Sequence, residues 1–203
     1  MKRIIILLVV GGIFLTDTFG QSVELGGFYG YNLNTRARTY YGDYTLYNNP
    51  NYGGQLSIGL AHNTFAELTY NRSDTQIRYY YNNAYEPLDM SSEYYHVGGL
   101  QQMDTGVDAL KPFGAFSLGA SRYNLKETYG EVYASDKWFM SIALALGAKI
   151  YLADMLGIRL QARMGLPMGF NGIWLGTGGA GASFYVPVAQ FDFSAGLFLK
   201  LGS

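Results

Sequence analysis

Only two residues of the chain, His62 and His96, could act as a general base near neutral pH. His62 is followed by Asn63 and Thr64, a combination that is common in turns. His96 shares a face of its predicted strand with Ser92, but their separation of four positions corresponds to roughly 13 Å, well beyond hydrogen-bond reach. A Ser–His nucleophile is therefore disfavoured here, and the sequence predicts no catalytic residue.

Metal and cofactor sites are not indicated either. The chain contains no cysteine, which excludes a disulfide framework and a thiolate metal site. No group of His, Asp and Glu has the spacing of metal ligands, and no glycine-rich loop has the context of a phosphate-binding loop. We therefore expect no metal, no cofactor and no enzymatic activity.

Several charged residues lie on the polar side of an alternating pattern. Every second residue from Trp138 to Leu152 is apolar, and those between them are mostly small or polar. This period of two is the pattern of β-strands, in which successive side chains point to opposite faces. The same pattern recurs at residues 158–166 and 191–201. The charged residues on the polar faces are Glu24, Glu67, Lys149, Arg159, Arg163, Asp192 and Lys200.

The alternation predicts eight strands joined by short and long connections in turn. The strands are expected at residues 23–33, 52–61, 65–73, 93–103, 112–123, 138–152, 157–167 and 184–201. The long connections are expected at residues 34–51, 74–92, 124–137 and 168–183. Short turns at one end, long loops at the other, and strands with one apolar face are typical of an outer-membrane barrel. The predicted fold is all-β, a single eight-stranded antiparallel up-and-down transmembrane barrel.

A soluble barrel that holds a ligand is the alternative fold. It needs apolar side chains inside and polar ones outside, whereas here the charges lie opposite the long apolar residues. Such a barrel would expose Leu144, Leu146 and Phe193 to water as part of a patch that would aggregate. Charged residues make up 14 % of the chain, against about 25 % in an average soluble protein. Both observations favour the membrane barrel.

Residues 1–20 have the features of a secretory signal peptide. Lys2 and Arg3 precede an apolar run at residues 4–15, which is too short for a membrane-spanning helix. We expect cleavage after Gly20, which leaves residues 21–203 as one barrel domain. This domain contains 12 basic and 14 acidic residues once Lys2, Arg3 and Asp17 are removed. That balance gives no basic patch for nucleic acid.

The signal peptide, the hairpin at residues 138–166 and the closing strand QFDFSAGLFLKL give the chain a family resemblance. It resembles the small outer-membrane β-barrels of Gram-negative bacteria, the porin-family or OmpA-like and OmpX-like eight-stranded type. The resemblance implies contact with outer-membrane lipid, insertion by the barrel-assembly machinery, periplasmic termini and extracellular long loops. Such barrels usually end on an aromatic residue. This chain departs from that pattern, since Leu201, Gly202 and Ser203 follow Phe198 and Lys200 at its end.

The charges on the polar faces are expected to form pairs inside the barrel. A lone buried charge is very costly, and an eight-stranded barrel is just wide enough for side chains to fill. We expect Glu24 to meet Lys200 near the periplasmic rim. Asp192 and Glu67 are expected to pair with Arg159 and Arg163. This network is predicted to plug the lumen, and the alternative is a narrow pore for ions or small solutes.

Tyrosine is concentrated near the ends of the predicted strands and in the long loops. Tyrosines at strand ends are expected in the interfacial aromatic girdle, at Tyr52, Tyr79–Tyr81, Tyr94, Tyr95 and Tyr123. Tyrosine mixed with Asn, Gly and Ser is typical of adaptable binding surfaces. We therefore expect loop residues that contact an extracellular ligand, namely Tyr40, Tyr41, Tyr44, Tyr47, Tyr85, Tyr129 and Tyr133. The sequence predicts a structural or surface-interaction role.

Overall fold

A computed structural model describes residues 22–34, 36–39, 42–46, 48–81, 84–126, 135–176, 179–185 and 189–202. These residues form the strands β1 (Val23–Asn34), β2 (Arg36–Thr39), β3 (Gly42–Leu46), β4 (Asn49–Ala61), β5 (Thr64–Tyr81), β6 (Ala84–Gln102), β7 (Leu110–Leu125), β8 (Ser135–Ala153), β9 (Leu156–Gly176), β10 (Gly179–Tyr185) and β11 (Gln190–Leu201). Within these ranges, no helix is long and apolar enough to span a membrane.

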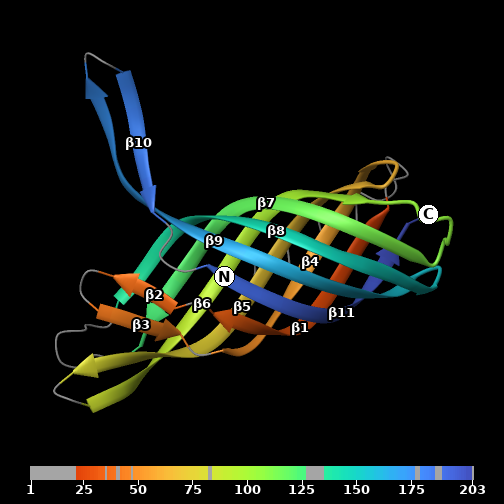
Figure 1. The fold of residues 1–203 in the computed structure, drawn as a ribbon. Coiled ribbons are helices and arrows are strands. Elements are labelled where there is room, and N and C mark those ends of the chain that lie inside the picture. The colour runs from red at the N-terminus through yellow and green to blue at the C-terminus, as the bar shows by residue number, and fades with distance from the viewer. Residues whose placement is uncertain are drawn as a thin grey trace, which may run out of the picture.

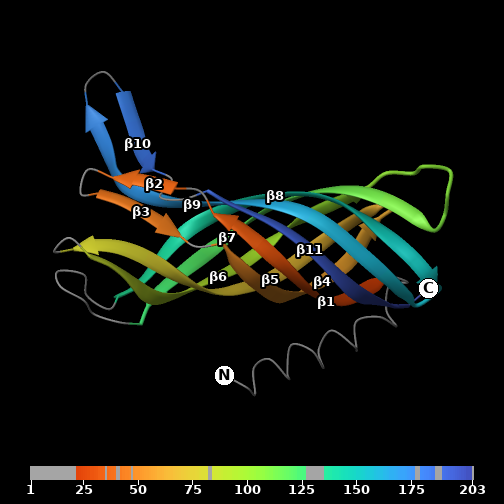
Figure 2. The ribbon, with the colours of Figure 1, turned by 60° about the horizontal axis from the view of Figure 1, so that its bottom comes forward.

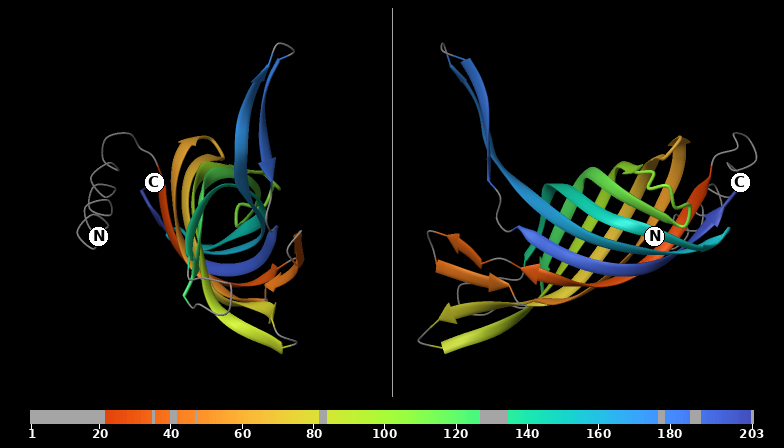
Figure 3. Two further views of the ribbon diagram at one scale, coloured as in Figure 1. Left: turned by 90° about the vertical axis from the view of Figure 1, so that its left-hand side faces the viewer. Right: turned by 45° about the vertical axis from the view of Figure 1, so that its right-hand side comes forward.

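Eight of the strands close into an antiparallel barrel. Their order around the wall is β5, β4, β1, β11, β9, β8, β7 and β6, and the pairing of β5 with β6 completes the ring. The first and last strands, β1 and β11, pair continuously from Val23 opposite Leu201 to Asn34 opposite Gln190. The view in the left panel of Figure 3 shows the closed ring. The predicted eight-stranded antiparallel barrel is therefore confirmed.

The outer wall of the barrel is apolar all the way round. Each barrel strand contributes a large apolar side chain that is at least 44 % exposed on this wall. One from each strand in chain order is Leu25, Leu60, Leu68, Val97, Leu118, Leu144, Leu160 and Leu197. A continuous apolar band of this kind has no stable contact with water, but it matches the hydrocarbon region of a bilayer. The alternation in the sequence is the direct cause of this band.

The two ends of the barrel differ in their connections. One end contains the two-residue turns at His62–Asn63 and Asp154–Met155, the 103–109 connection, and both ends of the described chain. Asn63 has a positive φ of 62°, which asparagine tolerates in tight turns. At the opposite end, β2–β3, the β5–β6 tip and β9–β10 project beyond the ring (Figures 1 and 2). The strands are thus joined by short turns at one end of the barrel and by long hairpins at the other.

The predicted boundaries are wrong at the hairpin end. Residues 74–92 were expected to form a loop, but β5 and β6 continue as a ribbon until Tyr81 opposite Ala84. The predicted eighth strand at 184–201 is divided, since Phe184 and Tyr185 belong to β10 and the barrel strand begins at Gln190. Alternation is imposed only where one face meets lipid. Beyond that level, backbone hydrogen bonds extend a ribbon without leaving an apolar period in the sequence.

The apolar wall leads to a prediction about charge at its mid-height. Leu144 lies near the middle of β8 and is 45 % exposed on the outer wall. We expect Leu144→Arg to lower the free energy of unfolding of the barrel in phospholipid vesicles by about 2–4 kcal/mol, because the guanidinium would face hydrocarbon. Urea titration of the vesicle-inserted barrel measures this loss. Met155→Arg, in the β8–β9 turn, is the matched control, and an equal loss in both variants would contradict the membrane-facing wall.

Asp104 joins two turns at the short-turn end. Its carboxylate accepts a hydrogen bond of 2.8 Å from Lys111 Nζ and one of 2.7 Å from Asn63 Nδ2. His62 Nε2 lies 3.3 Å from the same carboxylate. The hydrogen bond from Lys111, followed by those from Asn63 and His62, lowers the pKa of Asp104 to about 2. The β4–β5 turn is thereby tied to the β6–β7 connection.

The lowered pKa predicts how this tie responds to acid. Since the folded pKa lies below that of the unfolded chain, the carboxylate stabilises the fold fully above about pH 4 and loses this effect as the pH falls towards 2. We therefore expect Asp104→Asn to be less stable than wild type at pH 6 and to show a flatter dependence of stability on pH between 4 and 2. Urea midpoints at each pH measure the effect. Parallel curves for the two proteins would contradict it.

Candidate functional site

Most of the charged residues that the alternating pattern placed on the inner face are buried in the lumen of the barrel. Six side chains, Glu24, Glu67, Lys149, Arg159, Arg163 and Asp192, are only 1–8 % exposed. They come from β1, β5, β8, β9 and β11. Lys200, the seventh residue expected there, is only partly buried near the end of β11. Three cations and three anions therefore share the narrow interior.

Glu24 pairs with Lys149 and not with Lys200. Lys149 Nζ donates to Glu24 Oε2, and Tyr151 OH donates to Glu24 Oε1 at 2.9 Å. The backbones of Glu24 and Lys200 do lie opposite each other, but register fixes only the backbone. Lys149 is buried and needs a counter-charge, whereas Lys200 retains access to water at the rim. The predicted Glu24–Lys200 pair is therefore wrong.

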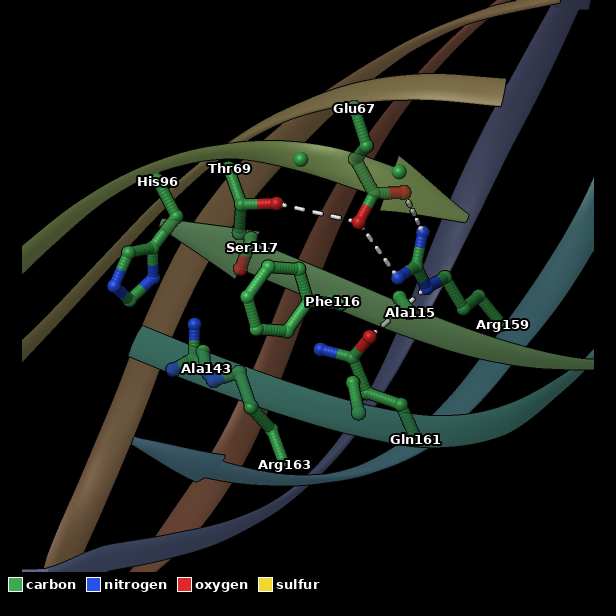
Figure 4. A pocket seen from close by; sticks show the side chains of 13 residues that line it. Glu67, Thr69, His96, Ala115, Phe116, Ser117, Ala143, Arg159, Gln161 and Arg163 are labelled. Atoms are coloured by element: carbon green, nitrogen blue, oxygen red, sulfur yellow. Dashed lines mark hydrogen bonds and ion pairs between the residues drawn. The ribbon is translucent and has the colours of Figure 1, made fainter. Parts of the chain in front are cut away.

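Glu67 and Arg159 meet across the lumen. Arg159 donates through both terminal nitrogens to the two oxygens of Glu67, and the Nη2–Oε1 distance is 3.0 Å. Ser57 Oγ donates to the same carboxylate at 3.0 Å. β5 and β9 stand on opposite sides of the ring, so this pair bridges the full width of the interior. Bidentate arginine–carboxylate pairs are strong and directional. Figure 4 shows the two side chains facing each other, with dashed lines for their hydrogen bonds.

Arg163 and Asp192 form the third pair on neighbouring strands. Their backbones are in register between β9 and β11, and Arg163 Nε donates to Asp192 Oδ2 at 2.8 Å. Arg163 follows Arg159 by four residues on β9, which is about 13 Å along the strand. The Arg163–Asp192 pair therefore lies closer to the hairpin end of the barrel than Arg159 does.

Aromatic rings fill the space beside the cations. Lys149 Nζ lies 4.4 Å from the ring centre of Phe65, and Arg159 Cζ lies 4.5 Å from that of Phe113. Phe113 itself lies over Gly147, where a Cβ would come within 2.6 Å of its Cζ. The small residue on β8 thus makes room for the ring on β7. These cation–π contacts add stabilisation that water-filled surroundings would weaken.

His96 forms a hydrogen bond that the sequence did not predict. Its Nε2 lies 2.7 Å from Ser141 Oγ, on β8, because Gly119 on the intervening strand β7 leaves the path open. Ser92, the partner considered from sequence, is instead 3.4 Å from Ser73 Oγ. His96 Nδ1 has no hydrogen-bond partner among the described residues. A histidine base in a nucleophilic site needs an orienting group and an accessible serine, so this pair fits a structural role.

The lumen contains a small cavity between the charge pairs. Its volume is about 20 Å³, and its lining includes Glu67, His96, Arg159, Gln161 and Arg163. Figure 4 shows these side chains around the space. Arg163 Nη1 is buried in it without a partner in the described part of the chain. A space of this size with several polar groups suits about one water molecule. Among the described residues, no three His, Asp or Glu side chains form a metal site.

The tyrosines are distributed between the outer wall and the lumen, and not only on the outer wall as the sequence predicted for those at strand ends. Tyr52 and Tyr95 are exposed on the outer wall, at 45 % and 40 %. Tyr94, however, is buried in the lumen, and its hydroxyl lies 2.6 Å from that of Tyr123. Their placement in the girdle is therefore wrong, because both follow the inward parity of β6 and β7. The contact residues Tyr40, Tyr41, Tyr47, Tyr129 and Tyr133 lie outside the described residues, and only the backbone is described for Tyr44 and Tyr85.

The closed ring, the apolar outer wall and the polar lumen define the fold of small outer-membrane β-barrel proteins. The chain is similar to the outer membrane protein OprG from Pseudomonas aeruginosa, with a TM-score of 0.62, 13 % identity, and coverage of 91 % of this chain and 97 % of OprG. It is also similar to Neisserial surface protein A, with a TM-score of 0.59, 12 % identity, and coverage of 90 % and 97 %.

A third similar structure is the N-terminal β-barrel domain of Pseudomonas aeruginosa OprF. Its TM-score is 0.51 at 13 % identity, and the match covers 89 % of this chain and 97 % of that domain. No protein-family model and no curated protein matches the sequence. The similarity is therefore one of fold, and at this level it confirms the resemblance inferred from the strand pattern.

The lumen pairs predict a specific pattern of mutational effects. Lys149→Met leaves Glu24 buried without its cation, and we expect a loss of about 3–5 kcal/mol in unfolding free energy. The double variant Glu24→Gln/Lys149→Met removes both charges and should recover most of that loss. Urea titration of the folded barrel in detergent micelles measures all three proteins. Equal losses in the single and double variants would contradict a coupled buried pair.

Proposed function

We propose that this protein is a non-enzymatic outer-membrane barrel that acts through its surface hairpins. Residues 1–20 are its cleaved signal peptide, and residues 21–203 form the barrel domain. Both termini face the periplasm and the long hairpins face the outside. The apolar wall and the likeness in fold to OprG and Neisserial surface protein A support the membrane location. The short turns at the end that carries both termini support the orientation.

The observation that carries the proposal is the filling of the lumen. The three buried ion pairs and the rings of Phe65 and Phe113 occupy the interior, and the cavity between them holds about one water molecule. In the described part of the barrel, these side chains leave little room for a solute to pass. This arrangement supports a plugged barrel, in which function belongs to the parts that extend beyond the membrane.

The hairpin end supplies the surface for that role. β2 and β3 join the extension of β5 through Thr45 opposite Arg78, and β10 joins the extension of β9. These ribbons project past the ring (Figure 3). The tyrosines of this region, with their Asn and Gly neighbours, have the composition of adaptable contact surfaces. The proposed partners are an extracellular ligand at the hairpins, outer-membrane lipid at the wall, and the barrel-assembly machinery during insertion.

A narrow pore for ions or small solutes is the second candidate. It is favoured by buried lumen atoms that lack partners among the described residues, including Arg163 Nη1, His96 Nδ1 and Asn71 Oδ1. Such atoms are the usual neighbours of ordered water. A line of water could then carry small ions if the Arg163–Asp192 pair opened.

Single-channel conductance in a planar bilayer decides between the two candidates. We expect no discrete steps from the folded wild-type protein, because the ion pairs close its lumen. Arg163→Ala, which opens the third pair, should remain silent if the other two pairs are sufficient to close the barrel. Lys111→Ala, at the short-turn end, is the control for a lost cation. Steps in the wild-type protein that change with Arg163→Ala, but not with Lys111→Ala, would establish the pore and overturn the plugged barrel.

A further inference from the structure

A row of alternating charges crosses the outer wall over four adjacent strands. Arg72 Nη1 on β5 lies 3.0 Å from Glu93 Oε1 on β6, and Glu93 Oε2 lies 3.4 Å from Arg122 Nη1 on β7. Arg122 Nη2 then reaches Asp136 Oδ2 on β8 at 2.7 Å. Asp74 adds a second carboxylate to Arg72, at 3.0 Å. We refer to these five residues as the charge ladder.

The charge ladder faces outward and is separate from the lumen network. Its residues alternate with inward side chains that are almost fully buried, such as Asn71, Ser121 and Tyr94. The side chains of Arg72 and Arg122 are 32 % and 31 % exposed, whereas that of Glu93 is only 9 % exposed. Glu93 therefore lies beneath the two guanidinium groups and holds them apart, with their free edges toward the surroundings of the barrel.

Two further layers follow on the side of the ladder that faces the short-turn end. The first is aromatic: Tyr70 and Tyr95 have ring centres 5.1 Å apart, and Tyr95 and Trp138 are stacked at 5.8 Å. The second is apolar and consists of Leu68, Val97 and Leu118, which are 47–61 % exposed. The wall therefore changes from apolar side chains to Tyr and Trp and then to charged side chains. The same order of polarity is found between the hydrocarbon region and the headgroups of a bilayer.

The guanidinium groups of the ladder retain hydrogen-bonding capacity. Arg72 and Arg122 each use three N–H groups on the carboxylates, through Nε, Nη1 and Nη2. A guanidinium carries five N–H donors, so each can accommodate a further acceptor without breaking its ion pairs. Arg122 also lies over the ring of Trp138, with Cζ at 5.7 Å from its centre. A planar donor group held in this way is suited to the oxygens of a phosphate.

We propose that the charge ladder binds the phosphate of a lipid headgroup, with the acyl chains of that lipid lying along Leu68, Val97 and Leu118. The inference rests on the membrane location given in the proposed function, because a lipid can reach the ladder only if the apolar wall beside it lies in the membrane. The three carboxylates of the ladder outnumber its two guanidinium groups, and Lys126, whose Nζ lies 3.6 Å from Asp74 Oδ1, brings the group to charge balance. Recognition therefore depends on directed N–H groups and not on net positive charge. Trp138 lies at the junction of headgroup and chain and is in contact with Arg122.

Trp138 can serve as the reporter of this site. The chain has two tryptophans, and Trp174→Phe leaves Trp138 as the only one. We would titrate this protein, folded in alkyl maltoside micelles, with phosphatidylglycerol and follow Trp138 emission. We expect a saturable change with the phospholipid and none with diacylglycerol of the same chains or with inorganic phosphate. Arg122→Gln should raise the half-saturating concentration by about tenfold, because it removes a charge-assisted donor pair.

The controls separate the possible outcomes. Lys111→Gln removes a cation at the other end of the barrel and should leave the titration unchanged. If Arg122→Gln fails to fold, Arg122→Lys keeps the charge without the planar fork and should still raise half-saturation severalfold. An equal response to diacylglycerol, saturation by inorganic phosphate alone, or an unchanged midpoint in the folded arginine variant would overturn the proposal. The conductance experiment tests the plugged lumen independently, so either proposal can fail without the other.

Discussion

Closure of the sheet is the constraint on which the rest of this structure depends. In a bilayer no water is present to pair with backbone N–H and C=O groups, so an open sheet edge is not tolerated. The continuous pairing of β1 with β11 removes both edges at once. Once the ring is closed, every second side chain must face lipid and the others must share a narrow interior. The apolar wall and the crowded lumen are two consequences of this one event.

The closed ring turns the lumen charges into partners. Glu24, Glu67 and Asp192 have no bulk water to solvate them, and Lys149, Arg159 and Arg163 are as deeply buried. Each anion therefore lies against one cation, with tyrosine, serine and aromatic rings completing the contacts. A buried pair contributes less to stability than its Coulomb energy suggests, since both ions lose hydration. Its clearer effect is to fill the interior and to fix which strands face each other.

The outer wall and the two ends of the barrel differ in their side chains and connections. The short turns are tied together by Asp104, whereas the opposite end carries ribbons that continue well beyond the ring. Between them, the wall passes from Leu68 and Val97 through Tyr95 and Trp138 to the charge ladder. The same strands β5 to β8 thus contribute lumen residues on one face and a lipid-facing surface on the other. This double use follows from the period of two.

The sequence by itself determined the number of barrel strands, their antiparallel order, and the facing of most strand side chains, because alternation is a local property of neighbouring residues. Tyr94 and Tyr123 were exceptions, since they were expected in the outer girdle but face the lumen. It did not determine which inward side chains meet. Lys149 in place of Lys200 as the partner of Glu24, and the His96–Ser141 bond over Gly119, depend on how the tilted strands bring distant residues together. The hairpin extensions were also missed. Past the ring the ribbons continue as backbone pairs, and only the tertiary structure decides where they end.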